Sequence, residues 1–167
     1  MKLKNCKGQI FTMDLIVAVT VLLFILVISM TSFGLIQNAL NEEEFYFEMQ
    51  EKALNASQAL VSTSGDPNTW ELLSDLNVNS IGLAKERNVL DKTKIDKLID
   101  LNSTNYEDIK EILGLAKYNF YFKITTINGQ TVKEFGTFPG SQNKTIVIER
   151  YVLLNGEERK LLLGVFE

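Results

Sequence analysis

Apolar residues are concentrated in one long run near the amino terminus of the chain. The 22 residues from Leu15 to Ile36 carry no charge, and their only polar side chains are four hydroxyls, those of Thr20, Ser29, Thr31 and Ser32. At about 1.5 Å of rise per residue, a helix of this length extends roughly 33 Å, enough to cross a hydrocarbon layer of about 30 Å. The pattern therefore predicts a membrane-inserting helix.

The apolar pattern continues beyond this run as a stripe on one helical face. Its members lie seven residues apart: Phe33, Leu40, Phe47, Leu54 and Val61. This spacing predicts one continuous helix from about Ile10 to Ser62, half of it lipid-compatible and half amphipathic. One interpretation of the outer half is that the stripe packs on the chain's own soluble domain.

Short helices are predicted after this long one. The sequence Ser64-Gly65-Asp66-Pro67 ends the first helix, and Asp66 or Asn68 is expected to cap the next, with an apolar side made of Trp70, Leu72, Leu73 and Leu76. Residues 77–88 are expected to be irregular, with a short strand around 81–84. Two further helices follow, from about Asp91 to Leu101 and from a Thr104–Glu107 capping box to a stop at Gly114.

After Lys117 the apolar period changes from that of a helix to that of a strand. Tyr118, Phe120, Phe122 and Ile124 alternate with more polar residues, and Asn128-Gly129 predicts a hairpin into 131–138. A second pair, 145–154 and 157–166, surrounds Asn155-Gly156. The predicted fold class is α+β: a long amino-terminal helix, short helices, and a four-stranded antiparallel sheet that backs the long helix. The domain organisation expected is a leader (1–8), the long helix (9–62) and a head domain (63–167).

Charge sets the expected orientation in the membrane. The chain has a net charge of −4, yet its first eight residues carry three lysines and no acid. The positive-inside rule then places the amino terminus in the cytoplasm and residues 37–167 outside. Three Asn-x-Ser/Thr sequons lie on that outer side and are candidates for glycosylation: Asn55, Asn102 and Asn143. The acidic exterior argues against nucleic acid as a partner.

Candidate chemistry is sparse. The chain has no histidine, and its only cysteine is Cys6. No hydrolase triad or phosphate-binding loop is recognisable, so no enzymatic activity and no cofactor or metal is predicted. Asp91, Asp96 and Asp100 with Asn102 can offer oxygen ligands to calcium, but a solvated helix face is the simpler interpretation. The aromatic strand from Tyr118 to Phe122 can stack on sugars or bases, or it forms the core of the sheet.

The amino-terminal sequence carries a more specific signal. Lys7-Gly8-Gln9-Ile10-Phe11-Thr12-Met13-Asp14, followed by the apolar run, resembles the class III leader of archaeal type IV pilin-like proteins. The resemblance implies cleavage between Gly8 and Gln9 by a prepilin-type membrane peptidase. It also implies that the retained helix bundles with its copies. The assembly residues expected on this helix are Asp14 and the stripe residues Phe33, Leu40 and Phe47. In that family an acid usually stands four residues after the glutamine, where this chain has Met13; the acid here is Asp14.

Two roles for Asp14 remain open at this point. Its carboxylate can mark the headgroup boundary, or it can pair with the amino group that cleavage would create at Gln9. The expectation for the whole chain is a single-pass membrane subunit that joins an extracellular filament, with other copies or related pilins as partners. The alternative is a membrane-tethered extracellular sensor or binding domain that does not polymerise.

Overall fold

A computed structural model of the chain describes residues 7–73, 78–141 and 144–167, with the side chains of 7–12 and 102–103 left outside the description. The chain forms two compact units, Met1–Phe45 and Tyr46–Glu167. Helix α1 contributes to both of them.

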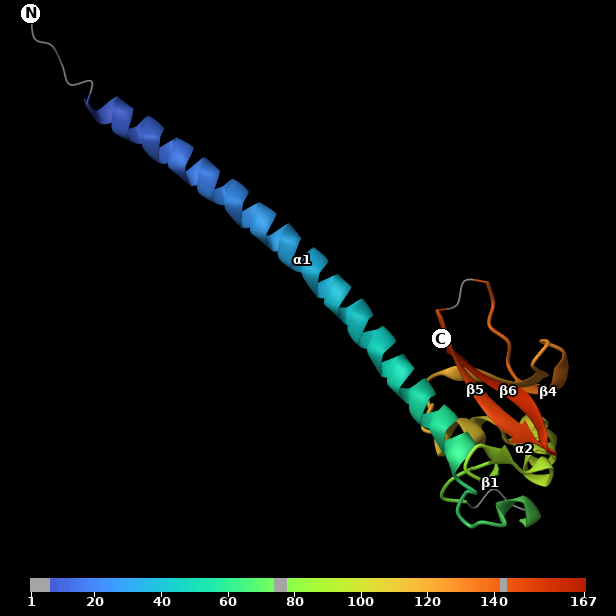
Figure 1. Cartoon of the computed structure of the whole chain (residues 1–167). Coiled ribbons are helices and arrows are strands. Elements are labelled where there is room, and N and C mark those ends of the chain that lie inside the picture. Colours follow the sequence, from blue (N-terminus) through green and yellow to red (C-terminus); the bar gives the residue numbers. More distant parts are fainter. Residues whose placement is uncertain (1–6, 74–77, 142–143) are drawn as a thin grey trace, which may run out of the picture. The chain divides into compact units, whose positions relative to one another are not determined.

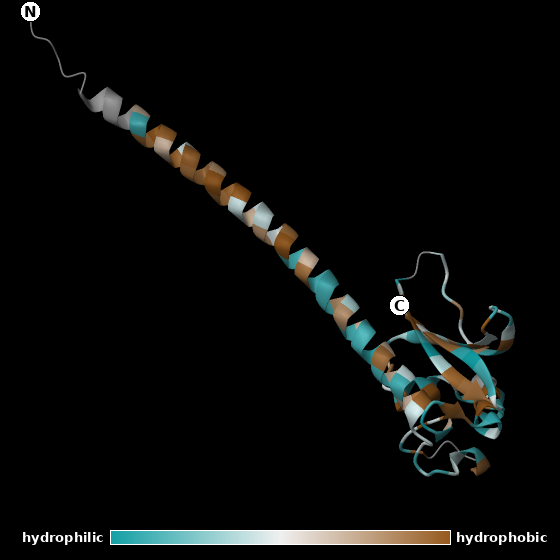
Figure 2. Cartoon of the chain, in the orientation of Figure 1, coloured by the Kyte–Doolittle hydropathy of each residue, from teal (hydrophilic) through white to brown (hydrophobic). Residues whose placement is uncertain are grey.

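Helix α1 runs without interruption from Lys7 to Ser62 (Figure 1). This confirms the predicted continuous helix and its end at Ser62. The hydropathy colouring changes along it, from a mostly apolar stretch to a mixture of polar and apolar residues (Figure 2). Over its apolar part the helix is long and apolar enough to cross a membrane.

The sheet of the second unit has six strands in the order β1-β2-β5-β6-β3-β4. Its strands are β1 (Ala84–Glu86), β2 (Val89–Leu90), β3 (Asn119–Thr126), β4 (Thr131–Gly136), β5 (Thr145–Leu154) and β6 (Glu157–Phe166). The four predicted strands are all present and pair antiparallel, and both Asn-Gly turns lie where the sequence places them. The prediction of a four-stranded, purely antiparallel sheet is nevertheless wrong, because β1 and β2 are added and β2 pairs parallel with β5.

The segment between α1 and the sheet departs furthest from expectation. Instead of a capped helix after Pro67, there is one 3₁₀ turn, η1 (Trp70–Leu72), whose N-cap residue makes no side-chain cap bond. Trp70 is buried as predicted, but Leu72 and Leu73 are exposed, and Leu76 lies outside the described residues. The Asp66 carboxylate accepts a hydrogen bond from the Asn79 side chain at 2.9 Å instead of capping a helix.

The two later helices form one kinked element, α2 (Lys92–Ile112), which has non-helical dihedral angles at Asn105. Its start agrees with the predicted one, and Asp91 caps it by accepting a hydrogen bond from the Thr93 amide at 2.8 Å. The predicted Thr104–Glu107 capping box is wrong. The Thr104 hydroxyl bonds to Asn105 at 2.7 Å, and Glu107 pairs with Lys110 at 2.9 Å.

The core lies on one face of the sheet. Phe120, Phe122 and Ile124 of β3 are buried, and so are alternate residues of β6, Leu161, Leu163 and Val165. The aromatic strand therefore forms sheet core, as the alternation favours. Residues of α1 that belong to this unit are also fully buried, namely Met49, Ala53 and Leu60.

Candidate functional site

The apolar run of α1 has no covering within its own unit. Every described side chain from Met13 to Glu44 is exposed. Thr20 and Thr31 satisfy their hydroxyls by donating to helix carbonyls one turn earlier, Ile16 O at 2.7 Å and Val27 O at 3.1 Å. Polar side chains that bond back to the helix suit an environment without water.

The sequence stripe divides between two environments. Phe33, Leu40, Phe47 and Leu54 are 63, 52, 69 and 45 % exposed, whereas Val61 is 1 % exposed. Met49, Ala53 and Leu60, which lie on the opposite side of the helix, are instead fully buried. Packing on the chain's own domain therefore accounts for the end of the helix but leaves the stripe from Phe33 to Leu54 open.

Polar contacts fix the rotation of α1 against the rest of its unit. The Lys52 ammonium donates to the Gly114 carbonyl at 3.2 Å. The Arg150 guanidinium donates to the hydroxyl of Ser57 at 3.4 Å, and Ser57 is fully buried. Because these contacts hold the opposite flank of the helix, Phe47 and Leu54 cannot turn inward without breaking them.

An ion pair joins the same flank of α1 to the start of β3. Glu48 lies 2.5 Å from Lys117, and the hydrogen bond lowers the pKa of the Glu48 carboxyl and raises the pKa of Lys117. Burial raises the pKa of the adjacent Tyr118 phenol. All three groups therefore keep their ordinary charge state near neutrality.

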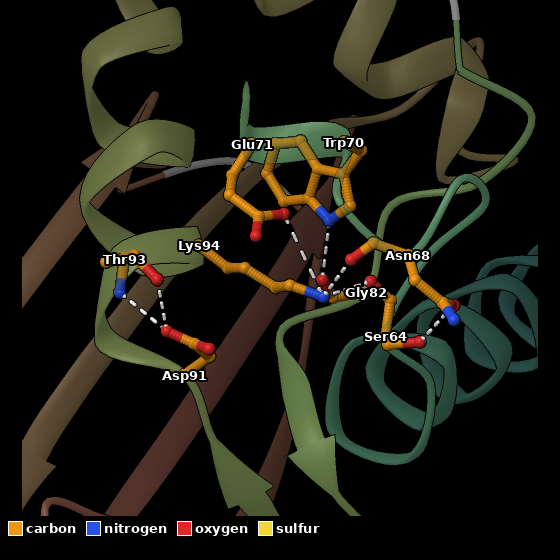
Figure 3. A network of polar contacts seen from close by, with 8 residues as sticks. All are labelled: Ser64, Asn68, Trp70, Glu71, Gly82, Asp91, Thr93 and Lys94. Atoms are coloured by element: carbon orange, nitrogen blue, oxygen red, sulfur yellow. Dashed lines mark hydrogen bonds and ion pairs between the residues drawn. The ribbon is translucent and has the colours of Figure 1, made fainter. Parts of the chain in front are cut away.

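A buried lysine holds the loop that follows α1 (Figure 3). Lys94 is 4 % exposed, and its ammonium donates to the carbonyls of Ser64 and Asn68 at 2.6 and 2.7 Å. The carboxylate of Glu71 lies 3.9 Å from the same nitrogen. A buried cation requires such partners. Lys94 thus acts as a structural clamp between α2 and the loop.

The other side of this loop is closed by Trp70. Its indole donates to the Gly82 carbonyl at 2.9 Å. A Cβ on Gly82 would lie 2.2 Å from the Thr63 carbonyl oxygen, so only glycine fits there.

Sequence reasoning missed Lys94, although its position four residues before the core residue Leu98 places it on the apolar side of α2.

The predicted leader and sequon residues are dispersed. Gly8 and Gln9 lie in the first turn of α1, with side chains outside the description, and Asp14 is exposed further along the helix. Asn55 is exposed on α1, but Ser57 of its sequon is buried. Asn102 lies within α2, with its side chain outside the described part, and Asn143 lies outside the described residues altogether.

Two of the three acidic residues considered for calcium have other roles. Asp91 caps α2, and Asp96 pairs with Lys133 of β4 at 3.0 Å. Within the described part of the chain, no group of three or more His, Cys, Asp or Glu side chains is arranged to hold a metal ion.

Comparison with known proteins adds no relative. No family model matches the sequence, and neither a curated protein nor a solved structure matches the chain.

Proposed function

We propose that this chain is a pilin-like structural subunit. A prepilin-type membrane peptidase would cut between Gly8 and Gln9, and α1 would hold the mature chain in the membrane until it is drawn into a surface filament. In the filament, the apolar helices of neighbouring copies would replace lipid as the surroundings of residues 15–36. The role is assembly and not catalysis.

One observation carries this proposal: the stripe from Phe33 to Leu54 stays exposed while the opposite face of the same helix is buried. Fully burying a Phe or Leu side chain is worth about 1.5–3 kcal/mol. A stripe that extends from the membrane segment past Phe47 therefore offers a long apolar surface to like helices. The class III leader resemblance supplies the processing step.

Mass spectrometry of chain extracted from membranes tests the processing step. We expect residues 1–8 to be missing and Gln9, or its pyroglutamate, to be the first residue. Changing Gly8 to a bulky residue, as in Gly8→Val, should leave the leader attached. An intact start at Met1 or Lys2 in the unaltered chain would favour the membrane-tethered binding domain instead.

Substitutions in the stripe test assembly separately. The double variant Leu40→Asn/Phe47→Asn should be processed normally but yield at least about tenfold less sheared filament, because two apolar contacts of about 1.5–3 kcal/mol each are lost. Asn38→Ser changes an exposed residue on another face of α1 and should leave the yield unchanged. Equal yields from the two variants would refute assembly through the stripe.

A further inference from the structure

Lys110 is a second buried lysine, and its surroundings differ from those of Lys94. It is 7 % exposed, and its ammonium lies 5.6 Å from the centre of the Tyr106 ring. The hydrogen bonds of Lys94 go to backbone carbonyls, which hold it as a structural clamp. The partners of Lys110 are instead side-chain groups, a carboxylate and a carboxamide. Its nitrogen therefore faces a group with which an amine can react.

The carboxylate and the carboxamide contact the same nitrogen atom. The Lys110 ammonium donates to Glu107 Oε2 at 2.9 Å and to Asn119 Oδ1 at 3.4 Å. Glu107 precedes Lys110 by about one turn of α2, whereas Asn119 is the first residue of β3. All three residues belong to the unit Tyr46–Glu167. The cluster thus brings together an amine, a carbonyl group and a proton acceptor.

Packing holds the reacting groups in place. Tyr106, which lies four residues before Lys110, stacks on Phe120 with ring centroids 5.1 Å apart. Its hydroxyl accepts from the Phe120 amide at 2.9 Å and donates to the Phe120 carbonyl at 3.0 Å. These contacts fix the residue next to Asn119 against the helix that carries Lys110. Groups held in contact react far faster than the same groups free in solution.

We propose that the side chains of Lys110 and Asn119 become joined by an amide bond. The Lys110 nitrogen loses a proton to Glu107 and attacks Cγ of Asn119. The bond between Cγ and Nδ2 then breaks, and Nδ2 is the leaving nitrogen. Two protons leave the Lys110 nitrogen in all, and both end on the departing nitrogen, which is released as an ammonium ion. One amide replaces another, so the step needs no oxidant or reductant.

The environment of the cluster suits this exchange. Removal of a lysine amine from water activates it as a nucleophile, and Lys110 is buried. The Glu107 side chain is 77 % exposed, so it reaches both the buried nitrogen and the solvent. Glu107 therefore accepts the proton from Lys110 as a general base and returns it to the departing nitrogen as a general acid.

The bond ties the kinked helix α2 to the sheet. It closes a ring from residue 110 to residue 119, and it holds the part of α2 that follows the non-helical dihedral angles of Asn105. The only cysteine of the chain is Cys6, so a disulfide within the chain cannot provide a covalent link. The inference does not depend on the proposed function, because it concerns this unit alone.

A tryptic digest of the full chain, produced in a host that does not glycosylate proteins, tests the bond. Trypsin does not cut after an acylated lysine, so the linked chain should give peptide 98–117, uncut at Lys110, joined to peptide 118–123. The mass of this branched product should be lower than the sum of the two peptides by one ammonia molecule. An unlinked chain should give three separate peptides, 98–110, 111–117 and 118–123.

Four variants identify the groups involved. Lys110→Arg keeps the charge and the donors but has no amine, and Asn119→Ala removes the carboxamide; neither should give the branched product. Glu107→Gln should lower the linked fraction at least about tenfold after equal times, because general acid–base catalysis contributes roughly 10²–10⁴. Lys92→Arg changes an exposed lysine of α2 and is the matched control, which should keep the branched product.

The unaltered chain decides the proposal even where a variant fails to fold. Only separate peptides from the unaltered chain would overturn the bond, and so would a branched product that survives Asn119→Ala. An unchanged linked fraction in Glu107→Gln would overturn the role of Glu107. Ammonia lost when Gln9 forms pyroglutamate belongs to a different peptide, so processing at Gly8 and the Lys110–Asn119 bond are tested separately.

Discussion

At the scale of single residues, loss of the buried Lys94 ammonium should be costly. Lys94→Met leaves the carbonyls of Ser64 and Asn68 without their donor, and a buried unsatisfied group costs about 1–3 kcal/mol. We expect a loss of about 2–4 kcal/mol in the free energy of unfolding. Denaturation in detergent can be followed by the fluorescence of Trp70, the only tryptophan. Lys97→Met removes the same charge one turn later and should change stability by less than about 0.5 kcal/mol.

Asp91 gives stability a dependence on pH. The hydrogen bond from the Thr93 hydroxyl holds the pKa of Asp91 below its usual range. Its contribution is therefore present above the ordinary pKa of about 3.9 and is lost as the pH falls through the lower folded value. Asp91→Ala should cost about 1 kcal/mol at pH 7, and the difference from the unaltered chain should shrink in acid. Asp91→Asn keeps a capping acceptor and should cost less; a gap that stays constant with pH would refute this assignment.

At the scale of elements, local patterns predicted what local physics controls. The alternation in 118–125 and the two Asn-Gly turns specified four strands, because side-chain period and turn chemistry act over a few residues. β1 and β2 were not predicted from the sequence, because they have only three and two residues. They are held by contacts with Val61 and Leu153, which are distant in sequence. The turn at Trp70 was not predicted either, because it is held by Lys94 and Gly82, which are also distant in sequence.

The sheet also contains a contact that sequence could not reveal. On the face of β6 away from the core, a Cβ on Gly164 would lie 1.9 Å from the ring of Tyr121, which stacks on Phe138 at a centroid distance of 5.2 Å. Gly164→Ala should therefore destabilise the chain by about 1–3 kcal/mol. In a Tyr121→Ala background the same change should cost much less, which thermal denaturation of the double-mutant cycle measures. Additive effects would contradict the proposed clash.

At the scale of the whole molecule, sequence predicted the helix and its stripe but not which face the domain covers. Phe47 and Ala53 are both apolar and lie in the same amphipathic half of α1. Their different exposure follows from Ser57 and Lys52, whose partners Arg150 and Gly114 are far away in sequence. Because distant contacts decide which face of the helix is buried, the local sequence does not show which face that is.

The division into two units leads to a final prediction about solubility. Residues 46–167 expressed alone should stay folded and soluble, because their core includes Met49, Ala53 and Leu60 and needs nothing from the apolar run.

The full chain should remain with membranes after alkaline extraction. Each arginine at the centre of a membrane helix costs about 2.5–3.5 kcal/mol, so Leu22→Arg/Ile25→Arg should release much of the chain, whereas Ser29→Ala/Thr31→Ala should not. Full retention of the double-arginine variant would show that residues 15–36 are not what anchors the chain.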